Sequence, residues 1–331
     1  MSTVLITHPR LIPDGPHYEI LKAAGFAIRI PPADADITQA EVLAELVGDA
    51  QSVIAGLEPY NQQVIEAAAQ LRVIARCGVG YDTVDVATCD ERNIAVTITP
   101  GTNHHSVAEH ALAMMLALSR GFPQRDLIVR NNRKWQKQPL PRFAGSTVGI
   151  VGLGRIGKAL AQRLPGLQVK TLAYEPQPDQ DFVNQHGVEL VDLDSLFRRS
   201  DFVSLHLPVT ADTQGMINSQ RLATMKPGAV LVNTARGALV VEDDLRQALT
   251  DGPLAGAGLD VLNQEPPATD HPLLRMENVL FSPHAAGVDA ASHHDSCAMV
   301  GQTLVDLYQG RWPDECIVNL QDASNWKWSS D

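Results

Sequence analysis

Short apolar runs alternate with amphipathic segments along the first third of the chain. The apolar runs are rich in aliphatic residues and are bounded by polar or turn residues, which is typical of strands. They predict strands at Val4–Thr7, Ala27–Ile30, Ser52–Ala55 and Arg72–Ala75. Between them, apolar residues recur at helical spacing around residues 17–25, 38–47 and 61–70. This alternation predicts βα units and a parallel sheet.

A second series of strands begins at Thr147 and predicts another parallel sheet. Its later strands are expected at Phe202–Leu205, Ala229–Val232, Ala255–Leu259 and Val279–Phe281. A long helical pattern from about residue 290 to residue 309 follows and could return the chain to the first domain. We therefore expect an α/β fold with two Rossmann-like domains, one discontinuous (1–102 plus 291–331) and one continuous (103–290), and an interdomain cleft for ligands.

Composition supports globular domains and narrows the partners. The 331 residues are 44% hydrophobic, which is enough for two substantial cores, and the net charge of −12 disfavours nucleic acid and anionic membranes. The four cysteines form no CxxC pair, so they are interpreted as thiols in a reducing compartment. Because there is no signal-like start and no apolar run near 18 residues, we expect a soluble, cytoplasmic protein.

A glycine turn connects the strand at Thr147 to an amphipathic helix. Gly152 permits the turn, Gly154 lets backbone approach a pyrophosphate, and Gly157 lets the helix lie close on the strand. Arg155 and Ile156 open the helix, whose free N–H groups and dipole favour an anion. The turn therefore predicts a dinucleotide site.

An acid follows the next strand at the distance typical of a ribose-binding residue. Glu175 is expected to bind the adenosine ribose hydroxyls and to repel a 2′-phosphate, and residues 176–181 contain no Arg or Lys. NAD is therefore favoured over NADP as cofactor. The alternative is that Glu175 is an ordinary solvated loop acid.

Several further motifs occur in a fixed order around the glycine turn. They are Arg76–Asp82, Thr99–Gly101, Ser106–His110, Leu205–Pro208, Asn233–Gly237, Leu259–Pro267 and Ser282–His284. With them, nearly the whole chain resembles the D-isomer-specific 2-hydroxyacid dehydrogenase family, which includes phosphoglycerate, glycerate and D-lactate dehydrogenases. The resemblance implies that residues 103–290 bind NAD and the discontinuous domain binds substrate.

The resemblance also assigns roles to individual residues. It implies a catalytic set of Arg236, Glu265 and His284, with Asp260 at the nicotinamide carboxamide. The remaining implied cofactor contacts are His206, Pro208, Thr234 and Ala235.

The chemistry of 2-hydroxy acid oxidation explains these residue types. His284 can take the hydroxyl proton, while Glu265 fixes its tautomer and favours the imidazolium needed for the reverse reaction. Arg236 can hold the substrate carboxylate through its planar fork, with the N–H groups around Val79 and Gly80 closing on the other side. Taken singly, each side chain could be a surface ion pair, a turn acid or a loop histidine. Together they follow strand ends of one sheet, which favours the catalytic interpretation.

His105 and Glu109 are four residues apart and would share a helix face, which raises a metal site as an alternative. The spacing is not HExxH, and hydride transfer requires no metal, so we expect no metal and interpret the helix Ser106–Leu118 as a packing or dimer element. In the family, this region and the following arm with Trp135 pack across a two-fold interface. The resemblance therefore implies a homodimer.

The substrate is less well defined than the reaction. Arg76 matches an arginine near the substrate phosphate of phosphoglycerate dehydrogenases, and Lys137 or Arg142 could add charge from a partner's arm. Glu58 would repel a phosphate, which puts 3-phosphoglycerate in doubt, so 3-phosphoglycerate, glycerate or a similar acid stay open as substrates. Two alternatives remain: an NAD(H)-sensing binding protein of the corepressor type, and different chemistry on a related scaffold, such as formate dehydrogenase or adenosylhomocysteine hydrolase.

Overall fold

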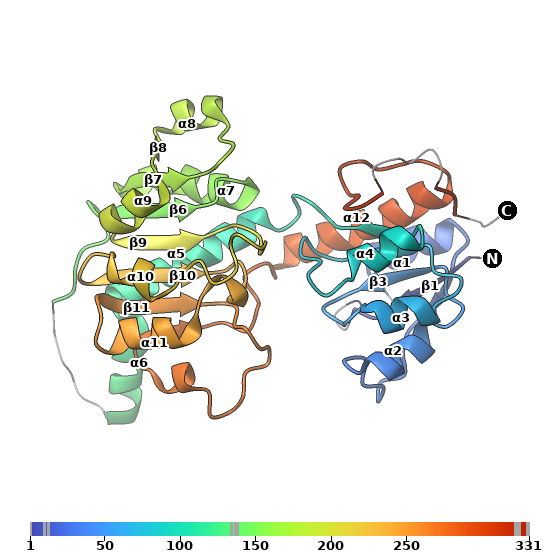
Figure 1. The fold of residues 1–331 in the computed structure, drawn as a ribbon, viewed down its shortest axis with the longest axis horizontal. Coiled ribbons are helices and arrows are strands. Elements are labelled where there is room, and N and C mark those ends of the chain that lie inside the picture. The colour runs from blue at the N-terminus through green and yellow to red at the C-terminus, as the bar shows by residue number, and fades with distance from the viewer. Residues whose placement is uncertain are drawn as a thin grey trace. The chain divides into compact units, whose positions relative to one another are not determined.

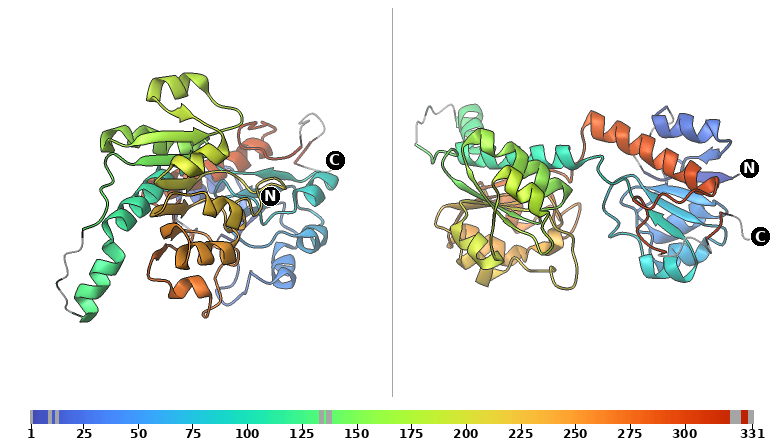
Figure 2. Two further views of the ribbon diagram at one scale, coloured as in Figure 1. Left: turned by 60° about the vertical axis from the view of Figure 1, so that its left-hand side comes forward. Right: turned by 90° about the horizontal axis from the view of Figure 1, so that it is seen from above.

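The chain forms two compact units, each built around its own sheet (Figures 1 and 2). The computed structural model describes residues 2–8, 11, 14–132, 135, 139–320 and 326–328. Unit 1 comprises Met1–Asn103 and Asp289–Asp331, and unit 2 comprises His104–Val288. The limits expected from the sequence, 102 and 291, lie close to these positions.

Unit 1 is a five-stranded parallel sheet with the order β2-β1-β3-β4-β5. The strands are β1 Thr3–Ile6, β2 Ala27–Arg29, β3 Ser52–Ala55, β4 Val73–Arg76 and β5 Ala95–Thr97. The helices are α1 Pro16–Ala23, α2 Ala40–Val47, α3 Gln62–Ala67, α4 Val86–Glu91 and α12 Ala290–Tyr308. Neither β5 nor α4 was predicted from the sequence.

Alternate residues of the unit 1 strands enter two cores, one on each face of the sheet. Leu5 and Val53 belong to one core, whereas Val4 and Ile54 belong to the other. Side chains of a strand point to opposite faces, so a sheet buried on both sides needs near-continuous apolar strands. Helix α12 packs against α1 and β4 on the second face.

Unit 2 is a seven-stranded parallel sheet with the order β12-β11-β10-β9-β6-β7-β8. The strands are β6 Thr147–Val151, β7 Lys170–Tyr174, β8 Glu189–Leu190, β9 Phe202–Leu205, β10 Ala229–Asn233, β11 Leu254–Leu259 and β12 Val279–Phe281. Of these, β8 was not predicted. The α/β fold with two Rossmann-like domains and parallel sheets is confirmed.

The helices of unit 2 flank this sheet. They are α5 His104–Arg120, α6 Phe122–Leu127, α7 Arg155–Arg163, α8 Gln180–His186, α9 Leu193–Arg199, α10 Ser219–Ala223 and α11 Glu242–Thr250. The short turns are the π-helix η1 Ile128–Asn132 and the 3₁₀ segments η2 Pro165–Leu167, η3 Gly237–Leu239 and η4 Pro272–Arg275. Helix α5 packs on α7, β10 and β11, as expected for a packing element. Across the described residues, no helix has both the length and the apolar character required to span a bilayer.

Candidate active site

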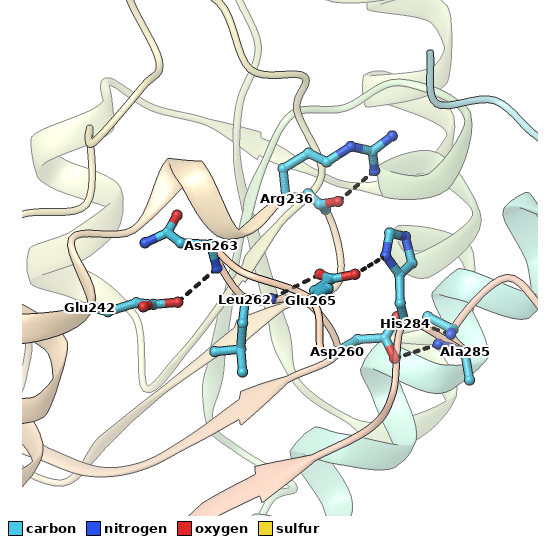
Figure 3. A network of polar contacts seen from close by, with 10 residues as sticks. Arg236, Glu242, Asp260, Leu262, Asn263, Glu265, His284 and Ala285 are labelled. Atoms are coloured by element: carbon cyan, nitrogen blue, oxygen red, sulfur yellow. Dashed lines mark hydrogen bonds and ion pairs between the residues drawn. The ribbon is translucent and has the colours of Figure 1, made fainter. Parts of the chain in front are cut away.

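Three neighbouring strands of unit 2 deliver the predicted catalytic residues to one edge of the sheet. Arg236 follows β10, Glu265 follows β11 and His284 follows β12, and these strands are adjacent and parallel. The carboxyl ends of parallel strands lie at the same edge, where such sheets place their ligands. Figure 3 shows the three side chains in this region.

His284 and Glu265 form a direct pair. Nδ1 of His284 lies 2.6 Å from Oε2 of Glu265, and both side chains are about one-third exposed. Leu262 N donates to the other oxygen of Glu265 at 3.0 Å. Burial acts to raise the pKa of Glu265, but the hydrogen bonds from His284 and Leu262 outweigh it, and the pKa lies below its usual value. Glu265 is therefore a carboxylate at neutral pH and accepts the Nδ1 proton.

The backbone of His284 is held in an uncommon conformation. Its φ is +51°, in the left-handed region, and its N–H donates to Asp260 O at 2.8 Å. The buried Asp260 carboxylate accepts from Ala285 N at 2.8 Å and from Ala286 N at 2.9 Å. Asp260 thus orders the turn that presents His284, a role that sequence reasoning missed. The only signal in the sequence was an acid directly after a buried strand.

Asn233, another residue not singled out from the sequence, shapes the turn of Arg236. Its side chain accepts from Ala235 N at 3.0 Å and donates to Arg236 O at 2.8 Å. Nη1 of Arg236 donates to Ala235 O at 2.6 Å. Thr234 is buried, and its hydroxyl has no hydrogen-bond partner among the described residues. The predicted cofactor contacts Thr234 and Ala235 therefore lie in the turn that carries Arg236.

The glycine turn has the close approaches that its spacing requires. Gly152 has a φ of +96°, and a Cβ there would lie 2.4 Å from His206 O. A Cβ at Gly157 would lie 2.1 Å from Gly152 O, whereas one at Gly154 would meet nothing within 4 Å. The first intrahelical hydrogen bond of α7 runs from Lys158 N to Gly154 O. The N–H groups of Arg155 and Ile156 lie before it in the first turn and have no acceptor within the helix. Open space at Gly154 beside a helix N-terminus suits a pyrophosphate.

The other predicted cofactor residues surround this turn. Glu175 accepts from Leu153 N at 2.8 Å and from Gln177 N at 3.2 Å, so its carboxylate faces the turn. His206 bonds Ser204 Oγ at 2.9 Å, and burial lowers its pKa to about 4, so this ring is neutral at pH 7. Pro208 is exposed two residues later.

The predicted substrate residues lie in unit 1, at the end of β4 and in the loop that follows it. Arg76 is 4% exposed, and it donates through Nε to Gly80 O at 2.8 Å and through Nη1 to Ala55 O at 2.9 Å. Its guanidinium therefore holds the loop that contains Val79 and Gly80 through the bond to Gly80 O. Among the described residues, neither Val79 N nor Gly80 N donates a hydrogen bond. Two adjacent backbone N–H groups can bind an anion where their conformation makes them converge.

The side chain of Glu58 lies inside the fold. It is 5% exposed and accepts from Gly56 N at 2.6 Å and from Thr7 Oγ1 at 3.4 Å. Burial raises the pKa of Glu58 above its usual value, although the hydrogen bonds and Arg76 oppose the effect. Its carboxylate therefore closes the turn after β3 from inside the fold.

The metal alternative at α5 finds no support in side-chain geometry. Glu109 pairs with Arg163 at 2.8 Å, and the same guanidinium lies 3.4 Å from His105 Nδ1. Over the ranges that the structure describes, no group of three or more His, Cys, Asp or Glu side chains is arranged to hold a metal. Of the two arm cations considered above, Arg142 is exposed and Lys137 lies outside the described residues.

Comparison with known proteins places this site in a family. The sequence profile of the D-isomer specific 2-hydroxyacid dehydrogenase NAD binding domain matches residues 112–286, more than half of the chain. A glyoxylate reductase of Korarchaeum cryptofilum is 40% identical over 84% of this chain and 85% of its own length. A D-3-phosphoglycerate dehydrogenase of Mycobacterium tuberculosis is 41% identical over 92% of this chain, which spans only 54% of that relative.

Solved structures agree with the sequence relatives. A D-lactate dehydrogenase from Aquifex aeolicus, complexed with NAD and lactic acid, has a TM-score of 0.85 at 27% identity and covers 97% of this chain and 100% of its own. The predicted cofactor, NAD, and the predicted class, a dehydrogenase acting on CH–OH groups, are confirmed. The chain belongs to the D-isomer-specific 2-hydroxyacid dehydrogenase family.

Proposed function

We propose that this protein interconverts a small 2-hydroxy acid and its 2-keto acid, with His284 as the acid/base. The observation that carries the proposal is the 2.6 Å contact between His284 Nδ1 and Glu265 Oε2 at the strand-end edge. A carboxylate on one ring nitrogen leaves the other, Nε2, for the substrate. The pair is thus an oriented base for one direction and an acid for the other.

The proton moves through His284 alone. In the oxidative direction, Nε2 accepts the hydroxyl proton, and the resulting imidazolium is stabilised by the Glu265 carboxylate through Nδ1. In the reductive direction, the imidazolium returns a proton from Nε2 to the carbonyl oxygen. Glu265 remains ionised in both directions, because its pKa lies below the usual value.

Arg236 and the loop after β4 would bind the substrate carboxylate. The Arg236 guanidinium can hold two carboxylate oxygens and polarise the C2 oxygen. The Val79 and Gly80 N–H groups form a second anion-binding element, whose shape Arg76 maintains through Gly80 O. A fixed carboxylate holds C2 in one orientation for the reaction.

NAD supplies the hydride acceptor when bound. Gly152, Gly154 and Gly157 would admit its pyrophosphate to the α7 N-terminus, where a Cβ at Gly154 would meet open space. Glu175 would bind the adenosine ribose, and its charge would disfavour a 2′-phosphate. His206, Pro208, Thr234 and Asp260 would complete the site, and the unpartnered Thr234 hydroxyl is a ready donor.

We infer that the preferred substrate carries no phosphate. Arg76 is buried, and its Nε and Nη1 donate to backbone carbonyls, so part of its guanidinium already serves the fold. The ionised form of Glu58, which interacts electrostatically with Arg76, would also oppose a phosphate dianion. A small unphosphorylated 2-keto acid such as glyoxylate fits this chemistry better than a phosphorylated one.

The test is NADH oxidation with glyoxylate, hydroxypyruvate, pyruvate and phosphohydroxypyruvate at fixed enzyme. We expect the highest kcat/KM for an unphosphorylated acid. A clear preference for phosphohydroxypyruvate would overturn the substrate inference. Failure of every member, with NADH still bound, would favour the NAD-sensing alternative.

We also propose that the protein is a homodimer. Apolar side chains of α6 and η1, namely Phe122, Leu127 and Val129, are exposed, and Trp135 in the following arm is 80% exposed. Exposed apolar clusters of this kind mark interaction surfaces. A second copy of the chain would cover them.

A further inference from the structure

Glu242, the first residue of α11, connects two segments of the chain beside the His284–Glu265 pair. Its Oε1 accepts from Asn263 N at 2.8 Å, and its Oε2 lies 3.2 Å from His271 Nε2. The side chains of Glu242 and His271 are each about one-fifth exposed. The carboxylate thus holds one end of the loop that follows β11 and the segment that leads into η4.

The same loop carries Glu265. Leu262 N donates to Glu265, and the next N–H along the chain, from Asn263, donates to Glu242. Two carboxylates therefore hold two consecutive peptide groups from opposite sides, as Figure 3 shows. A shift of Asn263 would move the neighbouring Leu262 N–H, which donates to Glu265. The Glu265 carboxylate, which orients His284, would then move as well.

The turn of Arg236 rests on this loop as well. A Cβ at Gly237 would lie 2.1 Å from Leu262 C and 2.4 Å from Asn263 N, so the two backbones are in direct contact. The loop therefore contacts both the turn that carries Arg236 and the carboxylate of Glu265. Glu242, the first residue of α11, holds this loop through Asn263 N.

Two other charged side chains near Glu242 interact with each other. Asp243 and Arg246 line the same surface pocket as Glu242 and His271, and Arg246 Nε lies 3.7 Å from Asp243 Oδ1. His271 Nδ1 is buried without a hydrogen-bond partner in the described chain, which places the ring proton on Nε2, toward Glu242. Glu242 is thus the acid that His271 and Asn263 share.

We propose that Glu242, supported by His271, is a positioning residue that holds the loop after β11 in register, so that Glu265 stays in contact with His284 and the Arg236 turn keeps its place. The proposal rests on the proposed function. A displacement near 1 Å at such a site costs about a hundredfold in rate. Because the loop contacts both Glu265 and the turn of Arg236, the loss of Glu242 should lower kcat and also raise KM for the keto acid.

The kinetic test compares Glu242→Ala, Glu242→Gln and Asp243→Ala. Glu242→Ala should lower kcat for the preferred keto acid by about ten- to a hundredfold and leave the Kd of NADH unchanged. It should also move the midpoint of the pH profile of kcat/KM for reduction to lower pH, because Glu265 would favour the imidazolium less. Glu242→Gln keeps an oxygen for Asn263 N–H and should recover much of the rate.

Asp243→Ala is the matched control, because it removes a neighbouring acid from the same helical turn. Its side chain is 89% exposed and pairs only loosely with Arg246. Wild-type kcat and pH profile are expected for this variant. If Glu242→Ala does not fold, Glu242→Asp, whose carboxylate is one methylene shorter, is judged by the same criteria.

A second readout needs no turnover. In protein labelled with [15N]histidine, the His284 Nδ1–H resonance, assigned by its loss in His284→Gln, should move or broaden in Glu242→Ala and stay in place in Asp243→Ala. An unchanged resonance with wild-type kcat would overturn the proposal. If the wild-type protein reduces no keto acid, the proposed function fails, while the resonance still decides whether Glu242 positions the pair.

Discussion

At the scale of single residues, His284 combines an uncommon backbone with a fixed side chain. Its left-handed φ of +51° is held by Asp260, and its ring is held by Glu265. Such conformations persist only where the surroundings over-determine them, and they cluster at functional sites. The ring is therefore oriented before any substrate arrives.

Replacing this ring should separate chemistry from cofactor binding. In His284→Gln, kcat/KM should fall by about 10²- to 10⁴-fold, because no group remains to move the proton. The Kd of NADH, followed by fluorescence, should stay near the wild-type value. His294→Gln, at an exposed histidine of α12, is the control and should behave as wild type. Turnover of His284→Gln near the wild-type rate would remove His284 from the mechanism.

Glu175 should decide the preference between the two nicotinamide cofactors. Glu175→Gln keeps an oxygen for Leu153 N–H but loses the charge, so the turn is preserved while repulsion of a 2′-phosphate disappears. We expect weaker NADH binding and a smaller gap between NADH and NADPH in parallel titrations. If the difference in affinity between NADH and NADPH does not change, a residue other than Glu175 recognises the ribose.

Two residue roles were beyond the reach of the sequence. The pattern identified Arg76 and Asp260 as site residues, but not that their side chains face backbone groups at Gly80, Ala55, Ala285 and Ala286. Side-chain direction at a strand end depends on the packing of the following loop, which a single sequence does not encode locally. That the side chain of Glu58 is buried was likewise not evident from the sequence.

At the scale of elements, long periodic segments were predicted well and short ones only in part. The strands of four or more residues were anticipated, as were the three-residue β2 and β12, whereas β5, with three residues, and β8, with two, were not. So few residues give no measurable alternation, and these strands exist because a neighbouring strand supplies hydrogen-bond partners. Helix α4, with six residues, likewise has too few turns to show an apolar stripe.

The glycine turn should tolerate no side chain at its first position. Gly152→Ala would place a Cβ 2.4 Å from a backbone oxygen at a φ of +96°. We expect a loss of about 1–3 kcal/mol in the free energy of unfolding and weaker NADH binding. Gly166→Ala is the control, because its Cβ would meet nothing within 4 Å. Equal urea midpoints and equal NADH affinities for the two variants would contradict the prediction.

The turn after β3 should give stability a pH dependence. Burial raises the pKa of Glu58 in the folded protein, so the unfolded chain ionises this group at lower pH. Raising the pH from about 4 to about 7 then favours the unfolded state at this residue. In urea unfolding, Glu58→Gln should gain stability relative to wild type across this interval. A difference that is constant with pH would show that Glu58 titrates normally.

At the scale of the whole molecule, the apolar surface of α6 and η1 should determine the oligomeric state. Phe122→Asp combined with Leu127→Asp should convert a dimer into a monomer in sedimentation experiments, because a charge at a buried interface costs several kcal/mol. Leu274→Asp changes an exposed leucine of η4 and should remain dimeric. A wild-type protein that sediments as a monomer would refute the dimer.

The return of the chain to unit 1 has a consequence for biosynthesis. Helix α12 contributes Cys297, Val300 and Leu304 to a core that also contains Val4 and Leu21. On the ribosome, the first strands of unit 1 therefore emerge with one apolar face covered only in part, by α1, and that core is completed only after all of unit 2 has been translated. Unit 2, an uninterrupted stretch, can fold as soon as it leaves the exit tunnel. The segment that is synthesised first is thus completed last, and chaperones would meet it in the interval.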